Sequence, residues 1–325
     1  MKKYFMAALV CLVFLAIGTQ TCNAVVDMGI TTGNEKGTYY RFGLDLKHLM
    51  AQHGIRLSVY PSSGSVDNIY TVYRVPSIQL GIVQSDVLAF VAEDASNKTL
   101  KSIARKIRIV FPLYNEEVHI VARKEIGQFS DLSGRRVAVG EDGSGTYLTA
   151  KLLFKASGIK PGQMLNIGPQ EALTLLKEGK IDAMFFVAGA PVKLFSEYIT
   201  KSDNLHLVPV TNSKILRYYP AAEIPATTYA WQDKPVSTVA VKAVLVSYAS
   251  HGDCPDVCGF ARVLFDNLDQ LVKKGHPKWK TVDLRYDIKG WKQFECVKKI
   301  LGLPVGEQKP FKPNPVLDAI EKALN

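Results

Sequence analysis

The sequence predicts an α/β protein of two lobes, each an open mixed sheet flanked by helices, with the lobes joined by two hinge strands. Strand-like and helix-like segments alternate along most of the 325-residue chain, which is typical of α/β proteins with open sheets. A strand, a glycine turn and a helix occur over 30–50, and the same unit recurs over 136–158. Two long β-rich stretches, 107–123 and 236–247, lie at the boundaries of these units.

The first lobe is expected to begin with a short strand over 30–32 that ends at a glycine. Apolar residues then recur at helical spacing from 42 to 50, and Gly54 is a suitable helix stop. A strand over 55–60, a helix over 66–74 and a strand over 78–83 follow. Together these segments supply the first strand and helix repeats of one lobe.

The second lobe repeats this plan after a turn at 130–134. A strand over 136–140 leads into a glycine turn and a helix that ends at Gly158. Apolar positions between 172 and 176 predict a further helix, and we expect two more strands over 181–187 and 205–210.

The stretches 107–123 and 236–247 predict strands that cross between the lobes, so that the chain leaves lobe 1, builds lobe 2 and returns. Ligands of such α/β proteins bind in the crevice at the strand ends, and crossing strands act as hinges. The predicted organisation is a signal peptide over 1–24, lobe 1 over 25–120 and 238–325, and lobe 2 over 121–237.

The C-terminal part of the chain is expected to pack back onto lobe 1. Its apolar residues Phe260, Val263, Leu264, Leu268 and Leu271 share one helical face. The proline-rich stretch 309–315 predicts an extended surface strap.

The N-terminus predicts export. Lys2 and Lys3 precede an apolar run over 5–17 and a polar stretch that ends at Ala24, the pattern of a secretory signal peptide cleaved near Ala24. No later segment has the roughly 18 consecutive apolar residues of a membrane span. A periplasmic protein is therefore expected, and lipid attachment at Cys22 is the alternative.

The charge is moderately basic. The formal net charge of +10 falls to +8 when the leader is removed, because 10 minus the two leader lysines leaves 8. Export and the scattering of Lys and Arg among acidic residues argue against nucleic acid as a partner. The charge therefore indicates a mild preference for anions.

Three cysteines remain after the leader, namely Cys254, Cys258 and Cys296. An oxidising compartment would let two of them pair, either Cys254 with Cys258 or one of these with Cys296. His251 and Asp253 beside Cys254 suggest a metal site as the alternative, but ligands from a second half of the chain are missing. We expect a disulfide and no metal.

Polar turns rich in glycine, hydroxyl and amide groups follow several predicted strands, and some of them open helices. A helix N-terminus offers free N–H groups and partial positive charge, so it can hold a carboxylate without an arginine. The alternative for residues such as Ser65 and Thr146 is simple helix capping, worth about 1 kcal/mol each. Asp86 is expected to be a cap or an acceptor of hydrogen bonds between the lobes. The candidate ligand-binding residues are Thr32, Gly33, Tyr39, Tyr40, Ser65, Asn68, Gln84, Ser85, Ser144, Gly145, Thr146, Gly189 and Pro191.

Enzymatic patterns are missing from the sequence. The six histidines are dispersed, with no His-Glu-x-x-His spacing, and no Gly-x-Ser-x-Gly elbow occurs. His119 falls within a predicted strand and is expected to be a packed or hydrogen-bonded residue. The expectation is a binding protein without catalytic residues or a cofactor.

The polar turns and several other short motifs of the chain, taken in order, resemble those of the TAXI family of receptors for tripartite ATP-independent periplasmic (TRAP) transporters. The resemblance implies a type II periplasmic-binding-protein fold and delivery of a solute to the integral membrane subunits of a TRAP permease. It also implies an anionic or zwitterionic ligand of the glutamate, glutamine or dicarboxylate type, bound by a monomer. The alternatives are a receptor of an ATP-driven transporter and an exported sensor. The motifs that carry the resemblance are Gly37-Thr38-Tyr39-Tyr40, Ser63-Gly64-Ser65-Val66-Asp67-Asn68, Gln84-Ser85-Asp86, Leu113-Tyr114, Asp131-Leu132-Ser133-Gly134, Gly143-Ser144-Gly145-Thr146, Gly179-Lys180-Ile181-Asp182-Ala183 and Gly189-Ala190-Pro191.

Overall fold

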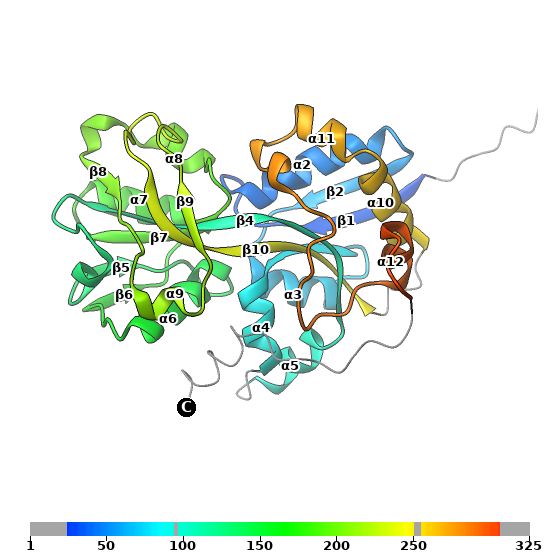
Figure 1. The fold of residues 1–325 in the computed structure, drawn as a ribbon, viewed down its shortest axis with the longest axis horizontal. Helices are drawn as coiled ribbons and strands as arrows, with labels where there is room; N and C mark the ends of the chain where they lie inside the picture. Colours follow the sequence, from blue (N-terminus) through cyan, green and yellow to red (C-terminus); the bar gives the residue numbers. More distant parts are fainter. Residues whose placement is uncertain (1–24, 94–96, 250–254, 306–325) are drawn as a thin grey trace, which may run out of the picture.

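The structure, a computed structural model, describes residues 25–93, 97–249 and 255–305. Over these ranges the chain forms two lobes, with two long strands running between them (Figure 1). Lobe 1 contains the strands β1 (Val26–Thr31), β2 (Ile55–Tyr60) and β3 (Leu80–Gln84). Lobe 2 contains β5 (Arg136–Ala138), β6 (Gln163–Leu165), β7 (Ala183–Ala188), β8 (Leu205–Leu207) and β9 (Ala221–Ile224), and the long strands are β4 (Ile107–Arg123) and β10 (Val236–Tyr248).

The two lobes repeat one strand order. The sheet runs β2-β1-β3-β10-β4-β7-β5-β6, so each half has three parallel strands followed by one antiparallel long strand. Successive parallel strands need a crossover, and helices supply it. This is the predicted mixed α/β architecture, and the recurrence seen in the sequence corresponds to a repeated structural unit.

The long strands β4 and β10 connect the lobes as predicted. Residues 107–117 of β4 pair with β10, and residues 117–122 pair with β7 of lobe 2. β10 in turn pairs with β3 of lobe 1 near its end and with β9 near its start. The β4–β10 pairing changes register beside Pro112, where a residue without an N–H can be accommodated. The exact residue boundaries of the lobes remain a prediction.

Helices cover the faces of both half-sheets. Helix α6 ends at Gly158, as the sequence predicts, and this glycine has a left-handed backbone conformation. The helices of lobe 1 are α2 (Thr38–Ala51), α3 (Ser65–Arg74), α4 (Ser85–Glu93) and α5 (Lys98–Ala104). Those of lobe 2 are α6 (Gly145–Ser157), α7 (Pro169–Lys177), α8 (Lys193–Tyr198) and α9 (Ser213–Leu216), with short 3-10 turns η1 (Phe129–Leu132) and η2 (Lys201–Asp203).

The C-terminal part packs on lobe 1, as expected, but not as one helix. The predicted apolar face is divided between α10 (Pro255–Asp266) and α11 (Leu268–Lys274), with Asn267 between them. Phe260, Leu264 and Leu271 share a buried cluster with Phe42 of α2. The turn η4 (Pro277–Thr281) and α12 (Glu295–Leu301) complete this layer.

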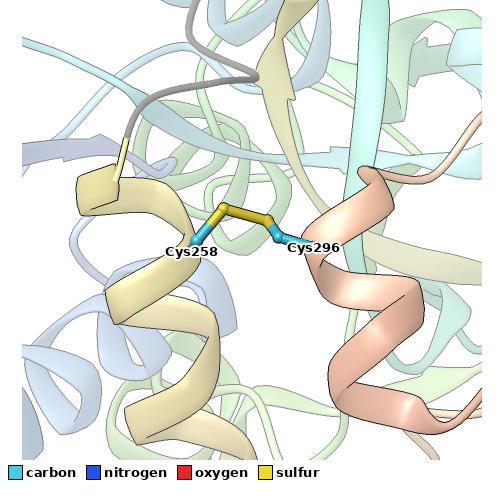
Figure 2. The surroundings of a disulfide bond; sticks show 2 residues. All are labelled: Cys258 and Cys296. Atoms are coloured by element: carbon cyan, nitrogen blue, oxygen red, sulfur yellow. A yellow bond between two sulfur atoms is a disulfide. The ribbon is translucent and has the colours of Figure 1, made fainter.

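A disulfide joins Cys258 of α10 to Cys296 of α12 (Figure 2). This is one of the pairings left open by the sequence, and it closes a loop with a sequence separation of 38. Cys254 lies outside the described residues, as do the predicted signal peptide and the proline-rich strap. Among the described residues no group of three or more His, Cys, Asp or Glu is arranged to hold a metal ion.

Each lobe has its own core, and a third cluster runs through both. One cluster is built on lobe 1 around Phe42 and Trp279, and another on lobe 2 around Phe195. The shared cluster includes Val87 of α4 and Leu148 of α6. In the described part of the chain, no helix has the length and apolar character needed to cross a membrane.

Candidate functional site

A cavity of about 60 Å³ lies between the lobes and is lined by both. One water occupies about 10–15 Å³ of such a cavity, so the space suits several waters or a small ligand. Lobe 1 contributes the turns that precede α2 and α3, and lobe 2 contributes the turns that precede α6 and α7. No Lys, Arg or His of the described residues lines the cavity.

Four helix N-termini therefore border one space. α2, α3 and α7 begin at Gly37, Gly64 and Gly168, and none of these positions has a side-chain cap. Gly64 has φ 128°, a conformation open to glycine, and a Cβ there would lie 3.3 Å from Cα of Ser144. Converging helix N-termini place partial positive charge around the cavity. The N–H groups of Val66 and Asp67 in α3 already donate to the Gly143 carbonyl, and α7 opens with Pro169, which has no N–H, so α2 and α6 are the main sources of N–H donors. The arrangement can hold an anion without a cationic side chain.

Hydrogen bonds close the lobes around the cavity. Thr38 Oγ1 donates to the Gly189 carbonyl at 2.6 Å, and Val66 N donates to the Gly143 carbonyl at 3.0 Å. Gly145 packs so closely against the Gln84 amide that a Cβ would overlap it. These contacts on several sides define a closed arrangement of the two lobes.

Asp86 links α4 to lobe 2. Its Oδ2 accepts from Thr149 Oγ1 at 2.7 Å and from Tyr219 Oη at 3.2 Å. Burial raises the pKa of the Asp86 carboxyl to about 6, although these hydrogen bonds act in the opposite direction. Asp86 is thus the acceptor of inter-lobe hydrogen bonds that the sequence suggested.

Glu116 of β4 is 1% exposed and reaches the cavity. Tyr39 Oη donates to its Oε2 at 2.6 Å. Burial raises the pKa of the Glu116 carboxyl well above its ordinary value. The neighbouring Glu117 has different partners. Its carboxylate accepts hydrogen bonds from Lys278 Nζ of η4 and, at 2.9 Å, from the Ala190 N–H.

His119 is a structural residue, as expected from its place in a strand. It is fully buried, and its Nδ1 lies 2.9 Å from the Glu117 carbonyl and its Nε2 2.8 Å from Tyr229 Oη. Burial lowers its pKa to about 4. A neutral ring with the proton on Nδ1 satisfies both hydrogen bonds.

The structure brings seven of the candidate residues to the cavity. They are Gly33, Tyr39, Ser65, Gln84, Ser144, Gly145 and Thr146.

The other candidates lie elsewhere. Asn68 is buried, and its amide donates to the Thr32 and Ile82 carbonyls. Thr32 Oγ1 donates to a carbonyl of β2 at 2.8 Å. Ser85 Oγ accepts from Lys242 N on the side of β10. Gly189 lies against Tyr114, Pro191 faces a separate groove, and Tyr40 does not line the cavity.

The candidate residues leave out the apolar wall of the cavity and five polar residues of its lining, which are Asn34, Thr38, Ser63, Glu116 and Glu141. Glu116 carries a recognisable signal, because it is one of two adjacent acids in a strand whose residues are mostly buried. The wall is formed by residues of strand β7, of the segment before α7 and of the first turn of α7, which the sequence marks only as core. Its residues are Ile167, Pro169, Ala172, Phe185, Phe186 and Val187.

Comparison with known proteins gives a family and a fold. The NMT1-like family matches residues 30–291. A structure titled as a periplasmic transporter has a TM-score of 0.59 at 13% identity, covering 93% of this chain and 97% of that chain. The periplasmic binding protein BugD has a TM-score of 0.58 at 12% identity, covering 91% and 96%. MatC from Rhodopseudomonas palustris, solved with malate, has a TM-score of 0.53 at 16% identity, covering 92% and 97%.

These similarities confirm the two-lobed periplasmic-binding-protein fold.

Proposed function

Because the chain belongs to the NMT1-like family, we propose that it is an extracytoplasmic solute receptor that binds a small organic acid or amino acid between its lobes. The observation that carries this proposal is the cavity bordered by four helix N-termini. Such an arrangement favours a carboxylate, because backbone N–H groups and helix dipoles act together on one anion.

The shape of the ligand follows from the lining. Hydroxyl and amide groups at Ser65, Gln84, Ser144 and Thr146 offer directed hydrogen bonds on one side. The aromatic and aliphatic wall at Phe185 and Ile167 offers contact for a short carbon chain. A small di-acid or an acidic amino acid combines both features, which supports a ligand of the glutamate, glutamine or dicarboxylate type.

The proposed mechanism is clamping. Ligand bridges the two lobes, and β4 and β10 bend to close them. A ligand holds the closed state only if it binds that state better than the open one. The closed surface is then recognised by the membrane subunits of a TRAP permease in the periplasm. The support for this partner is the resemblance of the polar turns to the TAXI family.

A thermal-shift panel tests the binding function. The purified mature chain is heated with L-glutamate, L-glutamine, L-malate, succinate, citrate and neutral sugars. We expect at least one carboxylate to raise the melting temperature in a concentration-dependent way, since a ligand of the native state stabilises it by mass action. Stabilisation by the sugars alone would argue against a carboxylate receptor.

A second candidate partner is the permease of an ATP-driven transporter, because the fold itself serves several kinds of receptor. Reconstitution separates the two. Uptake into vesicles that contain TRAP membrane subunits should depend on this protein and on an ion gradient, whereas ATP should be dispensable.

A further inference from the structure

The carboxyl group of Glu116 has one oxygen in use and one oxygen free. Oε2 accepts from Tyr39 Oη at 2.6 Å. Oε1 has no hydrogen-bond partner among the described residues, and the side chain lines the cavity. The residue is 1% exposed. A carboxyl oxygen in this position favours a hydrogen-bond partner. The cavity is the place from which that partner can come.

The charges around Glu116 leave it without a counter-ion. Tyr39 of α2 and Tyr114 of β4 are neutral, because burial raises the pKa of each hydroxyl. Asp86 of α4 and Glu117 of β4 are acids and disfavour a further negative charge. Lys278 of η4 is the nearby cation, but it pairs with Glu117.

These surroundings favour the protonated acid. Burial is the largest cause of the raised pKa of Glu116, and the repulsion from Asp86 and Glu117 acts in the same direction. The hydrogen bond from Tyr39 and the charge of Lys278 oppose the shift without overcoming it. In the protonated form, Oε2 still accepts from Tyr39 while Oε1 carries the proton.

Two other roles fit the same position less well. A purely structural acid would have both oxygens satisfied within the fold, as Asn68 has for its amide. An ionised carboxylate that pairs with a ligand ammonium group would meet the repulsion from Asp86 and Glu117 whenever the site is empty.

We propose that Glu116 is a further ligand-binding residue, and that its protonated carboxyl donates a hydrogen bond from Oε1 to a carboxylate of the ligand. The inference rests on the proposed receptor function and narrows it, because a site with this donor favours an organic anion over its ammonium-bearing analogue. Ligand binding then requires one bound proton at Glu116. The affinity therefore falls as the pH rises through the pKa of Glu116.

Infrared spectroscopy tests the protonation without any ligand. A protonated carboxylic acid has a carbonyl stretch that is separate from the carboxylate bands. At pH 7.5 we expect this band in the wild-type protein and its loss in Glu116→Gln, seen in the difference between the two spectra. A difference spectrum without the acid band would overturn the proposal, whatever the protein binds.

Calorimetry with L-malate and L-aspartate tests the role in binding, because these di-acids differ only in a hydroxyl or an ammonium group. At pH 7 we expect Glu116→Gln, which retains a donor and an acceptor, to bind malate within about threefold of the wild type. We expect Glu116→Ala to lose about tenfold or more, which corresponds to about 1.4 kcal/mol. Glu223→Gln, at an exposed position of β9 outside the cavity lining, is the matched variant and should bind malate as tightly as the wild type does.

The opposite results are equally informative. Tighter binding of aspartate than malate, with an affinity that rises with pH and collapses in Glu116→Gln, would show an ionised Glu116 paired with an ammonium group. Wild-type affinity in Glu116→Ala would show that the residue does not touch the ligand. If neither di-acid binds while the thermal-shift panel finds another ligand, the preference proposed here is wrong and the receptor function survives.

Discussion

Ser144 and Thr146 stand at the start of α6, and each hydroxyl accepts a backbone N–H while keeping its own proton. Ser144 Oγ accepts from Tyr147 N at 3.0 Å and caps the helix. Thr146 Oγ1 accepts from Val187 N at 3.1 Å and ties α6 to β7. Neither hydroxyl donates to a described residue, and both line the cavity. The two protons are therefore available to a ligand.

Replacing Ser144 and Thr146 by alanine should weaken ligand binding with the fold retained. The loss of one hydrogen bond of about 1 kcal/mol lowers affinity about fivefold. Loss of the cap also lowers the free energy of unfolding by about 1 kcal/mol. Calorimetry with the best ligand of the thermal-shift panel measures the effect, and the exposed Thr281→Ala is the control. Unchanged affinity in both single variants would remove these hydroxyls from the site.

The role of a single polar residue often depends on hydrogen-bond partners that are distant in the sequence and that only the fold brings close. Asn68 occurs in a polar turn and looked like a ligand-binding residue, but its amide is used by carbonyls of Thr32 and Ile82. The role of Glu116 cannot be predicted from its strand alone, because its contact with Tyr39 joins residues 77 positions apart. Residue type and local spacing cannot distinguish a polar group that serves the fold from one that faces a cavity.

The disulfide between Cys258 and Cys296 connects two helices of the C-terminal layer, α10 and α12. In the loop-entropy account, a bridge that closes a loop of this length stabilises the folded state by about 3–4 kcal/mol. We expect Cys258→Ser, and equally Cys296→Ser, to lower the free energy of urea unfolding by a similar amount. Cys254→Ser, which leaves both bonded cysteines in place, is the matched control. A reductant should destabilise the wild type but have no effect on either bridge variant.

Elements with a strong local pattern were predicted well, and those set by packing were not. The strand predicted over 107–123 coincides with β4, because β-branched and aromatic residues recur along it and suit a strand at the centre of the sheet. The single helix expected over the apolar face at 260–271 is divided at Asn267 instead. Its periodicity is compatible with either form, and the break is decided by the surface of lobe 1 that both helices cover.

At the scale of the molecule, the pH dependence of Asp86 reports on the contact between the lobes. The carboxyl is buried, and its pKa of about 6 exceeds its ordinary value. A carboxyl with a raised folded-state pKa stabilises the fold below its unfolded pKa, and this contribution disappears as the pH rises through the folded pKa. The window is therefore about pH 4 to 6, and the shift corresponds to about 3 kcal/mol.

Asp86→Asn should remove this dependence, because an amide does not titrate. Measured by urea unfolding, the stability of the wild type relative to Asp86→Asn should fall by about 3 kcal/mol between pH 4 and pH 7. Exposed Asp233→Asn serves as the control and should track the wild type. A difference that stays constant, or that grows in favour of the wild type at higher pH, would contradict the assignment.

The overall architecture was accessible from the sequence because it is repeated. The order β2-β1-β3 beside one long strand is matched by β6-β5-β7 beside the other, and the recurring strand, glycine turn and helix is its signature. The closure of the lobes left no such signature. Closure depends on contacts between turns such as 143–145 and residues of the other lobe. These contacts join residues far apart in the chain, and no local sequence pattern predicts them.

The seam between the lobes near the cavity is made largely of backbone carbonyls and small residues. Gly143 and Gly189 offer their carbonyls across it, and Gly145 offers no side chain. When the lobes separate at this contact, hydrogen bonds to water replace the hydrogen bonds between the lobes. Each replacement lowers the stability of the closed state by only about 1 kcal/mol. In the proposed clamping mechanism, such exchangeable hydrogen bonds would let a ligand of few atoms hold the lobes together.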